Sequence, residues 1–250
     1  MESPPADESI ERTGARVAEY VALSDVGRVR DGNEDSYLAS PPLFVVADGM
    51  GGAQAGEVAS SAVIEAFEAA LELGTLPESL PDTIQAANAS IFEMASGDRS
   101  LAGMGTTTTA VMLVDGEVAL AHVGDSRAYR MRDSKLEQLT DDHSLVGGLV
   151  RLGKLTPAEA EKHPQRSVIL RAVGVEAKVE VDVFRLAIED GDVYLLCSDG
   201  LSSMVRDEVI EETLRTDHKL DETAEMLVDL ANASGGRDNV TVVLFRVAAS

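Results

Sequence analysis

The sequence has little cysteine and no long apolar run. Its single cysteine, Cys197, excludes an internal disulfide and a zinc site built from several cysteines. No apolar run approaches the roughly 18 residues that cross a bilayer. Residues 1–16 carry prolines and mixed charge but no apolar signal core, so we read them as a disordered tail. These absences predict a cytoplasmic protein in a reducing compartment.

Positive charge is also scarce. The 250 residues include 44 acidic and 21 basic side chains, which gives a formal net charge of -23. Nucleic-acid phosphates and anionic membranes repel such a chain, so neither is an expected partner. We read most of the acidic excess as a solvated surface that aids solubility.

Strand and helix patterns come in blocks rather than in regular alternation. Apolar and β-branched runs predict strands, and apolar residues at helical spacing predict two pairs of helices. The strands are expected at 17–23, 43–47, 106–114, 118–123, 128–131, 135–139, 179–186, 193–197 and 240–247, and the helices at 57–73, 81–95, 207–214 and 221–231. Hairpins and paired helices favour an α+β fold with antiparallel sheets in one domain, residues 17–248. A polar helical segment at about 141–168 is expected to be a mobile flap.

Five aspartates lie in short glycine- and serine-rich turns that end apolar runs. They are Asp35, Asp48, Asp125, Asp199 and Asp238. Each of these segments, taken alone, is explained as an ordinary turn without a function. Asp48 and Asp199, however, both follow an apolar strand and precede glycine, and this pattern brings two carboxylates to one edge of a core. Gathered carboxylates repel one another and take up protons unless cations relieve them. The sequence therefore predicts a multinuclear site for magnesium or manganese, which prefer oxygen ligands.

Seven stretches occur in an order that points to one family. They are 27–35, 46–52 (Val-Ala-Asp-Gly-Met-Gly-Gly), 105–107, 123–129 (Val-Gly-Asp-Ser-Arg-Ala-Tyr), 141–144, 196–201 and 237–241. Together they resemble the metal-dependent type 2C protein phosphatases (PPM), especially compact bacterial members. The resemblance covers about residues 18–247. It implies a four-layer αββα sandwich, in which helix pairs flank two antiparallel sheets and the metal centre lies between the sheets at one edge.

The resemblance also implies a role for each matched residue. Asp48, the carbonyl of Gly49, Asp199 and Asp238 would hold two core manganese or magnesium ions, and Asp125 with Asp199 would hold a possible third. Glu34, Asp35 and Asn239 would lie in the outer shell around the ions, and Arg30 would bind the substrate phosphate. Arg30, Asp35 and Asp48 would then be the catalytic set.

These roles predict hydrolysis of phosphoserine and phosphothreonine in proteins by a metal-activated water. The expected partners are phosphorylated targets of a serine/threonine kinase, and the expected state is a monomer. The net charge favours targets with basic residues near the phosphosite. Met50 stands where many eukaryotic members carry a histidine, so the proton for the leaving oxygen would come from a metal-bound water or from His163 in the flap. An exposed structural role explains His163 equally well.

Two other functions deserve comparison. A non-catalytic, phosphoprotein-binding relative would be expected to lack a metal carboxylate, and none is missing here. The hypothesis of an ATPase depends on residues 148–154, which match most of a P-loop. Leu155 then stands where the motif needs a serine or threonine for magnesium, so this alternative is weak.

Overall fold

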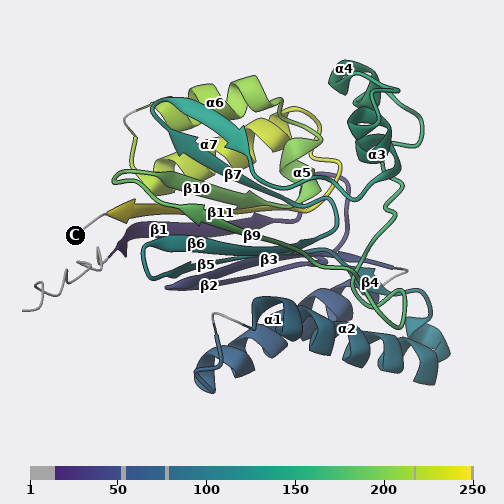
Figure 1. The fold of residues 1–250 in the computed structure, drawn as a ribbon. Coiled ribbons are helices and arrows are strands. Elements are labelled where there is room, and N and C mark those ends of the chain that lie inside the picture. Colours follow the sequence, from purple (N-terminus) through teal and green to yellow (C-terminus); the bar gives the residue numbers. More distant parts are fainter. Residues whose placement is uncertain (1–14, 52–54, 77–78, 217, 249–250) are drawn as a thin grey trace, which may run out of the picture.

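The fold has four layers. The computed structural model describes residues 15–51, 55–76, 79–216 and 218–248, so the tail predicted at 1–16 lies almost wholly outside the described residues. Two antiparallel sheets lie face to face, and a helix pair covers the outer face of each (Figure 1). This confirms the predicted α+β sandwich. No helix in these described ranges is both long and apolar enough to span a bilayer.

One sheet joins the N-terminal strand to the C-terminal half of the chain. Its strands, in spatial order, are β1 (Arg16–Asp25), β11 (Val240–Ala248), β10 (Val193–Cys197), β7 (Arg127–Arg132) and β8 (Lys135–Gln138). The helices α6 (Asp207–Arg215) and α7 (Leu220–Ala233) lie on its outer face, and the short helix α5 (Asp199–Ser202) follows β10. We call this the C-terminal sheet.

The other sheet, the N-terminal sheet, has the order β2 (Asp35–Ser40), β3 (Leu43–Met50), β5 (Thr108–Val114), β6 (Glu117–Val123) and β9 (Asp182–Ala187). A short strand β4 (Gly105–Thr106) pairs with the end of β3. The helices α1 (Ala55–Glu72) and α2 (Leu80–Gly97) cover the outer face of the N-terminal sheet. A 3-10 helix, η1 (Arg99–Leu101), follows α2. The two predicted hairpins are confirmed, because β5 pairs with β6 and β7 pairs with β8.

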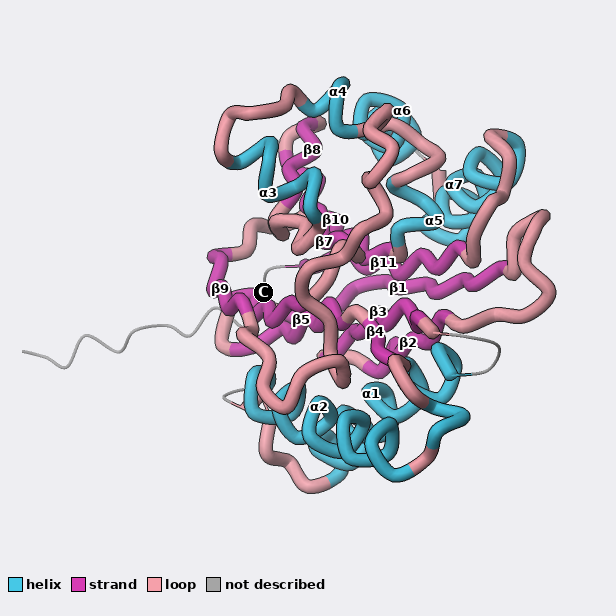
Figure 2. Tube along the Cα trace, turned by 90° about the vertical axis from the view of Figure 1, so that its right-hand side faces the viewer, coloured by secondary structure: helices cyan, strands magenta, loops and turns pink. Residues whose placement is uncertain are grey.

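The expected flap contains two short helices, α3 (Leu145–Arg151) and α4 (Pro157–Ala160). Figure 2 views the sandwich from the end at which these helices lie, and it shows α3 and α4 on the same side as α6. Thr156 and Glu159 form a capping box at the start of α4, with Pro157 at its first position. The helical character is confirmed, whereas the mobility stays a prediction.

Strand alternation determines what each sheet presents to its neighbour. In β3, Leu43, Val45 and Ala47 pack on the α1 and α2 side, whereas Phe44 and Val46 face the other sheet. Phe44 stacks on Phe245 of β11 with ring centroids 4.2 Å apart, which fixes the two sheets face to face. Asp48 continues the inward-facing series of β3, so the strand delivers its carboxylate between the sheets at their edge.

The structure contains elements that the sequence pattern did not predict. Strand β2 was not predicted, because its sequence Asp-Ser-Tyr-Leu-Ala-Ser has no apolar run; it forms by pairing with β3 at the edge of the sheet. The short helix α5 was not predicted either. The strands predicted at 179–186 and 193–197 are present as β9 and β10, and they belong to different sheets, since β9 pairs with β6 and β10 pairs with β7 and β11.

The aromatic contact between the sheets gives a stability prediction. Phe245 is fully buried and stacks on Phe44 and Tyr194, so Phe245→Ala should lower the free energy of unfolding by about 3–5 kcal/mol. The matched control is Phe184→Ala, since Phe184 is 37% exposed on β9, and its loss should be about 1 kcal/mol. Urea unfolding at fixed metal concentration measures both. Equal losses would contradict a core that holds the sheets together at Phe245.

Candidate metal centre

The N-terminal sheet brings Asp35 and Asp48 opposite each other. Asp35 opens β2, Asp48 lies near the end of β3, and the strand register pairs the two residues directly. The backbone N–H of Asp48 donates to the hydroxyl of Thr107 at 2.9 Å, and that hydroxyl is 2.7 Å from the hydroxyl of Ser126. The end of β3 is therefore tied to the turn that carries Asp125.

The C-terminal sheet brings the other carboxylates to the same place. Asp199 begins α5 directly after β10, and Asp238 lies just before β11. Between the sheets, the Asp35 oxygen Oδ2 accepts hydrogen bonds from Ser198 at 2.8 Å and Thr241 at 2.7 Å. These bonds cross from one sheet to the other, so all four carboxylates belong to one cluster.

Desolvation and repulsion dominate the electrostatics of the cluster. Burial raises the pKa of Asp35 to about 6, although hydrogen bonds from Thr241 and Ser198 lower it. Burial and then the charge of Asp238 raise the pKa of Asp199 to about 6. Asp48 keeps some exposed surface, yet desolvation followed by repulsion from the other aspartates raises its pKa well above the usual range. The cluster favours protons or cations.

Asp125 is another member of the cluster whose carboxyl favours its proton. Burial, followed by repulsion from Asp199 and Asp142, raises the pKa of Asp125 to about 8. Its oxygen Oδ1 and that of Asp35 are buried without a hydrogen-bond partner. Buried, unsatisfied carboxylate oxygens are costly, and a hard divalent cation would satisfy them.

The donor set fits magnesium or manganese, but the ligands are not preassembled. As the side chains stand, no three Asp, Glu, His or Cys residues in the described part of the chain are arranged to hold a metal ion. All nearby donors are oxygens, which suits hard divalent ions better than zinc. Gly49 lies beside Asp48, and a Cβ there would come within 2.2 Å of the Gly56 carbonyl oxygen, so only glycine fits.

Arg30 lies at the mouth of this cluster. Its Nη2 donates to Asp238 Oδ2 at 2.8 Å, its Nη1 lies 3.7 Å from Glu34, and its side chain is 47% exposed. Desolvation by burial is the first cause of a raised pKa at Glu34. The structure thus brings Arg30 and Glu34 to the carboxylates, with Arg30 in contact with an expected metal ligand.

The Asn239 side chain holds the loop that carries Arg30. Its Oδ1 accepts from the N–H of Glu34 at 2.8 Å. Its Nδ2 donates to the carbonyls of Val26 at 2.9 Å and Gly32 at 2.8 Å. One side chain therefore holds both ends of the loop that carries Arg30.

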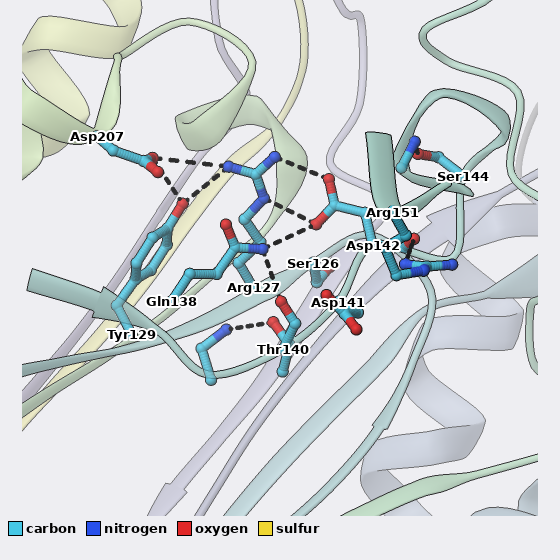
Figure 3. Close-up of polar contacts among 12 residues, drawn as sticks. Ser126, Arg127, Tyr129, Gln138, Thr140, Asp141, Asp142, Ser144, Arg151 and Asp207 are labelled. Carbon is cyan, nitrogen blue, oxygen red and sulfur yellow. Dashed lines mark hydrogen bonds and ion pairs between the residues drawn. The ribbon is translucent and has the colours of Figure 1, made fainter. Parts of the chain in front are cut away.

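A polar clamp connects the Asp125 turn to the flap, and sequence reasoning did not identify it. Arg127 donates from Nε and Nη2 to the two oxygens of Asp142, at 2.9 and 2.7 Å (Figure 3). Its Nη1 donates to the Tyr129 hydroxyl at 2.9 Å, and that hydroxyl donates to Asp207 at 3.0 Å. In the flap, Arg151 donates to the Asp142 carbonyl at 2.9 Å. The only sequence signal for Arg127 and Asp142 is that each lies in one of the stretches that resemble the family.

A second missed contact holds the same turn from its other side. The Gly124 N–H donates to His143 Nδ1 at 3.0 Å, so the neutral ring carries its proton on Nε2, 3.1 Å from Asp182 Oδ2. Arg171 donates to the other Asp182 oxygen at 2.6 Å. His143 is thus a structural residue, and it positions Gly124 beside Asp125.

A cleft of about 710 Å³ separates the flap from α5 and α6. Asp125 and Asp199 lie in its wall, together with flap residues such as Arg151 and Lys162. His163 is not among the lining residues; its Nδ1 accepts from the Gln165 N–H at 3.2 Å. The structure therefore places two expected ligands under the flap but does not bring His163 to them.

Comparison with known proteins gives close relatives. The sequence model of a family described as protein phosphatase 2C matches residues 31–239. A serine/threonine phosphatase, Stp, of Listeria monocytogenes is 42% identical over 233 residues, which are 88% of this chain and 92% of the relative. The serine/threonine protein phosphatase PstP of Mycobacterium tuberculosis is 46% identical over 91% of this chain, which spans 45% of that protein.

Solved structures agree with these sequences. A crystal structure of M. tuberculosis PstP has a TM-score of 0.85 and 44% identity, covering 91% of this chain and 97% of that one. A structure of a PstP catalytic domain in complex with two manganese ions has a TM-score of 0.83 and 40% identity, covering 94% and 100%.

The clamp predicts a large cost for Arg127→Ala. The ion pair joins side chains only 22% and 17% exposed, and the substitution removes two hydrogen bonds to Asp142 and one to Tyr129, so it should cost about 2–4 kcal/mol of unfolding free energy. The control is Arg246→Ala, whose 3.9 Å pair with Glu19 is 41% and 45% exposed and should cost at most about 1 kcal/mol. Denaturant unfolding measures both, and similar costs would contradict the clamp.

The raised pKa of Asp125 predicts a pH dependence for chelated protein. In the unfolded chain this carboxyl ionises near pH 4. The folded protein holds the proton to about pH 8, so the stabilisation is present at low pH and is lost as pH rises through 8. Between pH 7 and 8.5 the free energy of unfolding in chelator should fall by about 1 kcal/mol.

Two comparisons isolate that effect. Asp125→Asn removes the titrating group, so its stability in chelator should change less over the same pH interval. Saturating manganese should stabilise the native protein more at pH 8.5 than at pH 7, because the ion replaces the lost protons. A native protein whose stability in chelator is constant or rises over this interval would show that Asp125 is not held protonated.

Proposed function

The chain belongs to the protein phosphatase 2C family and is a metal-dependent protein serine/threonine phosphatase, and on this premise we propose that Asp48, Asp199 and Asp238 hold its two core divalent ions. Asp48 would bridge the ions, and the carbonyl of Gly49 would complete the second site. The observation that supports this assignment most is the desolvated cluster around Asp48, to which both sheets contribute. A similar catalytic domain holds two manganese ions.

The bound ions would lower the pKa of water and neutralise charge on the substrate phosphate. The chain's own residues would position these partners. Asp35 is held by Ser198 and Thr241 through one oxygen, which leaves Oδ1 free to orient a water. Arg30, exposed at the mouth, would donate two N–H groups to the phosphate and so fix its orientation.

The source of the final proton is constrained by Met50. A methionine side chain has no proton to donate, and Met50 is in the β3 extension that pairs with β4. The leaving serine or threonine oxygen would therefore take its proton from water or from His163. Water is the better supported donor, because His163 does not line the cleft that contains Asp125 and Asp199.

We assign the possible third ion to Asp125 and Asp199, which share the wall of the cleft under the flap. The expected substrates are proteins that serine/threonine kinases phosphorylate. A non-catalytic relative is not favoured, since all metal carboxylates are present and the relatives are named as phosphatases. The cytoplasmic location and the monomeric state stay predictions.

Two substitutions test the assignment of residues. Asp48→Asn should abolish manganese binding in calorimetry and lower kcat for a phosphothreonine peptide by at least about 100-fold, because it removes the ligand shared by both ions. Arg30→Ala should keep manganese binding but raise KM by about tenfold, because it removes a guanidinium from the phosphate. Arg246→Ala is the control for loss of one arginine. Full turnover in chelator, or by Asp48→Asn, would contradict the proposal.

A further inference from the structure

Three arginines lie on two neighbouring loops at the mouth of the metal centre. Arg28 and Arg30 are on the loop between β1 and β2, and Arg237 directly precedes Asp238. All three side chains are exposed. In a chain with 44 acidic and 21 basic residues, such a local group of positive charges is unusual.

The two loops form one rigid support. The Arg28 N–H donates to the Gly236 carbonyl at 2.7 Å. Gly27 has a φ of +86° and packs so closely that a Cβ would come within 2.3 Å of the Asp238 carbonyl oxygen. Asn239 anchors the same loop through Val26 and Gly32. The backbones of Arg28 and Arg237 are therefore fixed relative to each other.

The stems of Arg28 and Arg237 rest on adjacent glycines. A Cβ on Gly236 would lie 2.7 Å from Arg28 Cγ, and a Cβ on Gly235 would lie 3.8 Å from Arg237 Cγ and 3.9 Å from its Nε. Gly235 and Gly236 have φ values of +129° and +50°, which larger residues rarely adopt. The backbone turn that places the Arg28 and Arg237 side chains on adjoining loops thus depends on these glycines.

Arg28 and Arg237 form no ion pair with a carboxylate among the residues that the structure describes. Within the described ranges, no carboxylate oxygen lies within 4.0 Å of the guanidinium of Arg28 or Arg237, whereas Arg30 pairs with Asp238. Arg28 acts only weakly on Asp25, whose pKa is lowered first by a hydrogen bond from Gly27 and only last by the charge of Arg28. Arginines elsewhere in the sandwich, such as Arg132 and Arg171, are paired. Arg28 and Arg237 are available to an external anion.

We propose that Arg28 and Arg237 form a second anion subsite beside the phosphate held by Arg30, and that it binds a phosphate or carboxylate on a residue flanking the scissile phosphoserine or phosphothreonine. This inference rests on the proposed function of the metal centre. It assigns the enzyme a preference for multiply phosphorylated or acidic segments of proteins. Guanidinium groups suit this task because their planar donors bind both anions in pairs.

The overall charge of -23 suggests the opposite preference, for basic flanking residues. That field is screened beyond about 8–10 Å at ordinary salt, so distant carboxylates contribute little at the mouth. Arg28 and Arg237 flank Arg30 and Asp238 along the chain, so a residue next to the bound phosphoresidue would meet their charges before those of the distant acidic surface. The local charge is therefore expected to decide the preference.

The test compares matched phosphothreonine peptides that differ at one flanking position. The position carries alanine, phosphoserine, glutamate or lysine, and separate peptides place it before or after the phosphothreonine. The readout is the ratio of kcat/KM for each peptide to that of the alanine peptide, at constant manganese and ionic strength. The proteins are the native chain, Arg28→Ala, Arg237→Ala, the double variant, and Arg246→Ala as a control on the far end of β11.

The native protein should favour the phosphoserine peptide by about three- to tenfold, mainly through KM. The double variant should lose this preference, and Arg246→Ala should keep it. An equal gain with glutamate identifies a carboxylate-tolerant subsite, and a gain with phosphoserine alone identifies a phosphate subsite; both support the proposal. An unchanged ratio in the double variant, or a native preference for lysine, would overturn it. A native chain that cleaves none of the peptides with manganese would instead overturn the proposed function.

Discussion

Desolvated aspartates of like charge, held between two sheets, are the constraint on which the rest of the structure depends. The pKa of Asp48 is raised by burial and then by Asp35, Asp199, Asp125 and Asp238. Such a cluster is tolerated only with protons or cations to offset the repulsion. Divalent ions bound there would stabilise the fold and supply the catalytic charge. Folding and activity would therefore both depend on the contacts between the ions and these aspartates.

The surrounding structure acts to hold that cluster in place. The stacked rings of Phe44, Tyr194 and Phe245 set the sheets face to face, and the bonds from Ser198 and Thr241 to Asp35 close the gap at their edge. The clamp of Arg127 on Asp142 then ties the flap to the turn that carries Asp125, as Asn239 ties the loop that carries Arg30 to β11. Each contact links segments far apart in sequence.

Much of this could be predicted from the sequence, because strand periodicity and strand-ending Asp-Gly pairs are local signals. They located β3 and β10 and the carboxylates at the ends of these strands. Strand β2 was not predicted, because its stability comes from pairing with β3 and its own residues carry no apolar pattern. The sequence also did not predict the contact of Arg30 with Asp238, 208 positions apart, or the role of Asn239 in the loop. A pattern along the chain does not show which loops lie in contact.

The central claim is that one shared aspartate joins two ions between the sheets. A crystal structure of the manganese-soaked protein, with anomalous scattering recorded for manganese, tests it most directly. The account predicts two strong manganese peaks at the edge of the sandwich, both in contact with Asp48, with Asp199 and Asp238 on the first. Manganese peaks confined to the acidic surface, or a pair of peaks that does not touch Asp48, would contradict it.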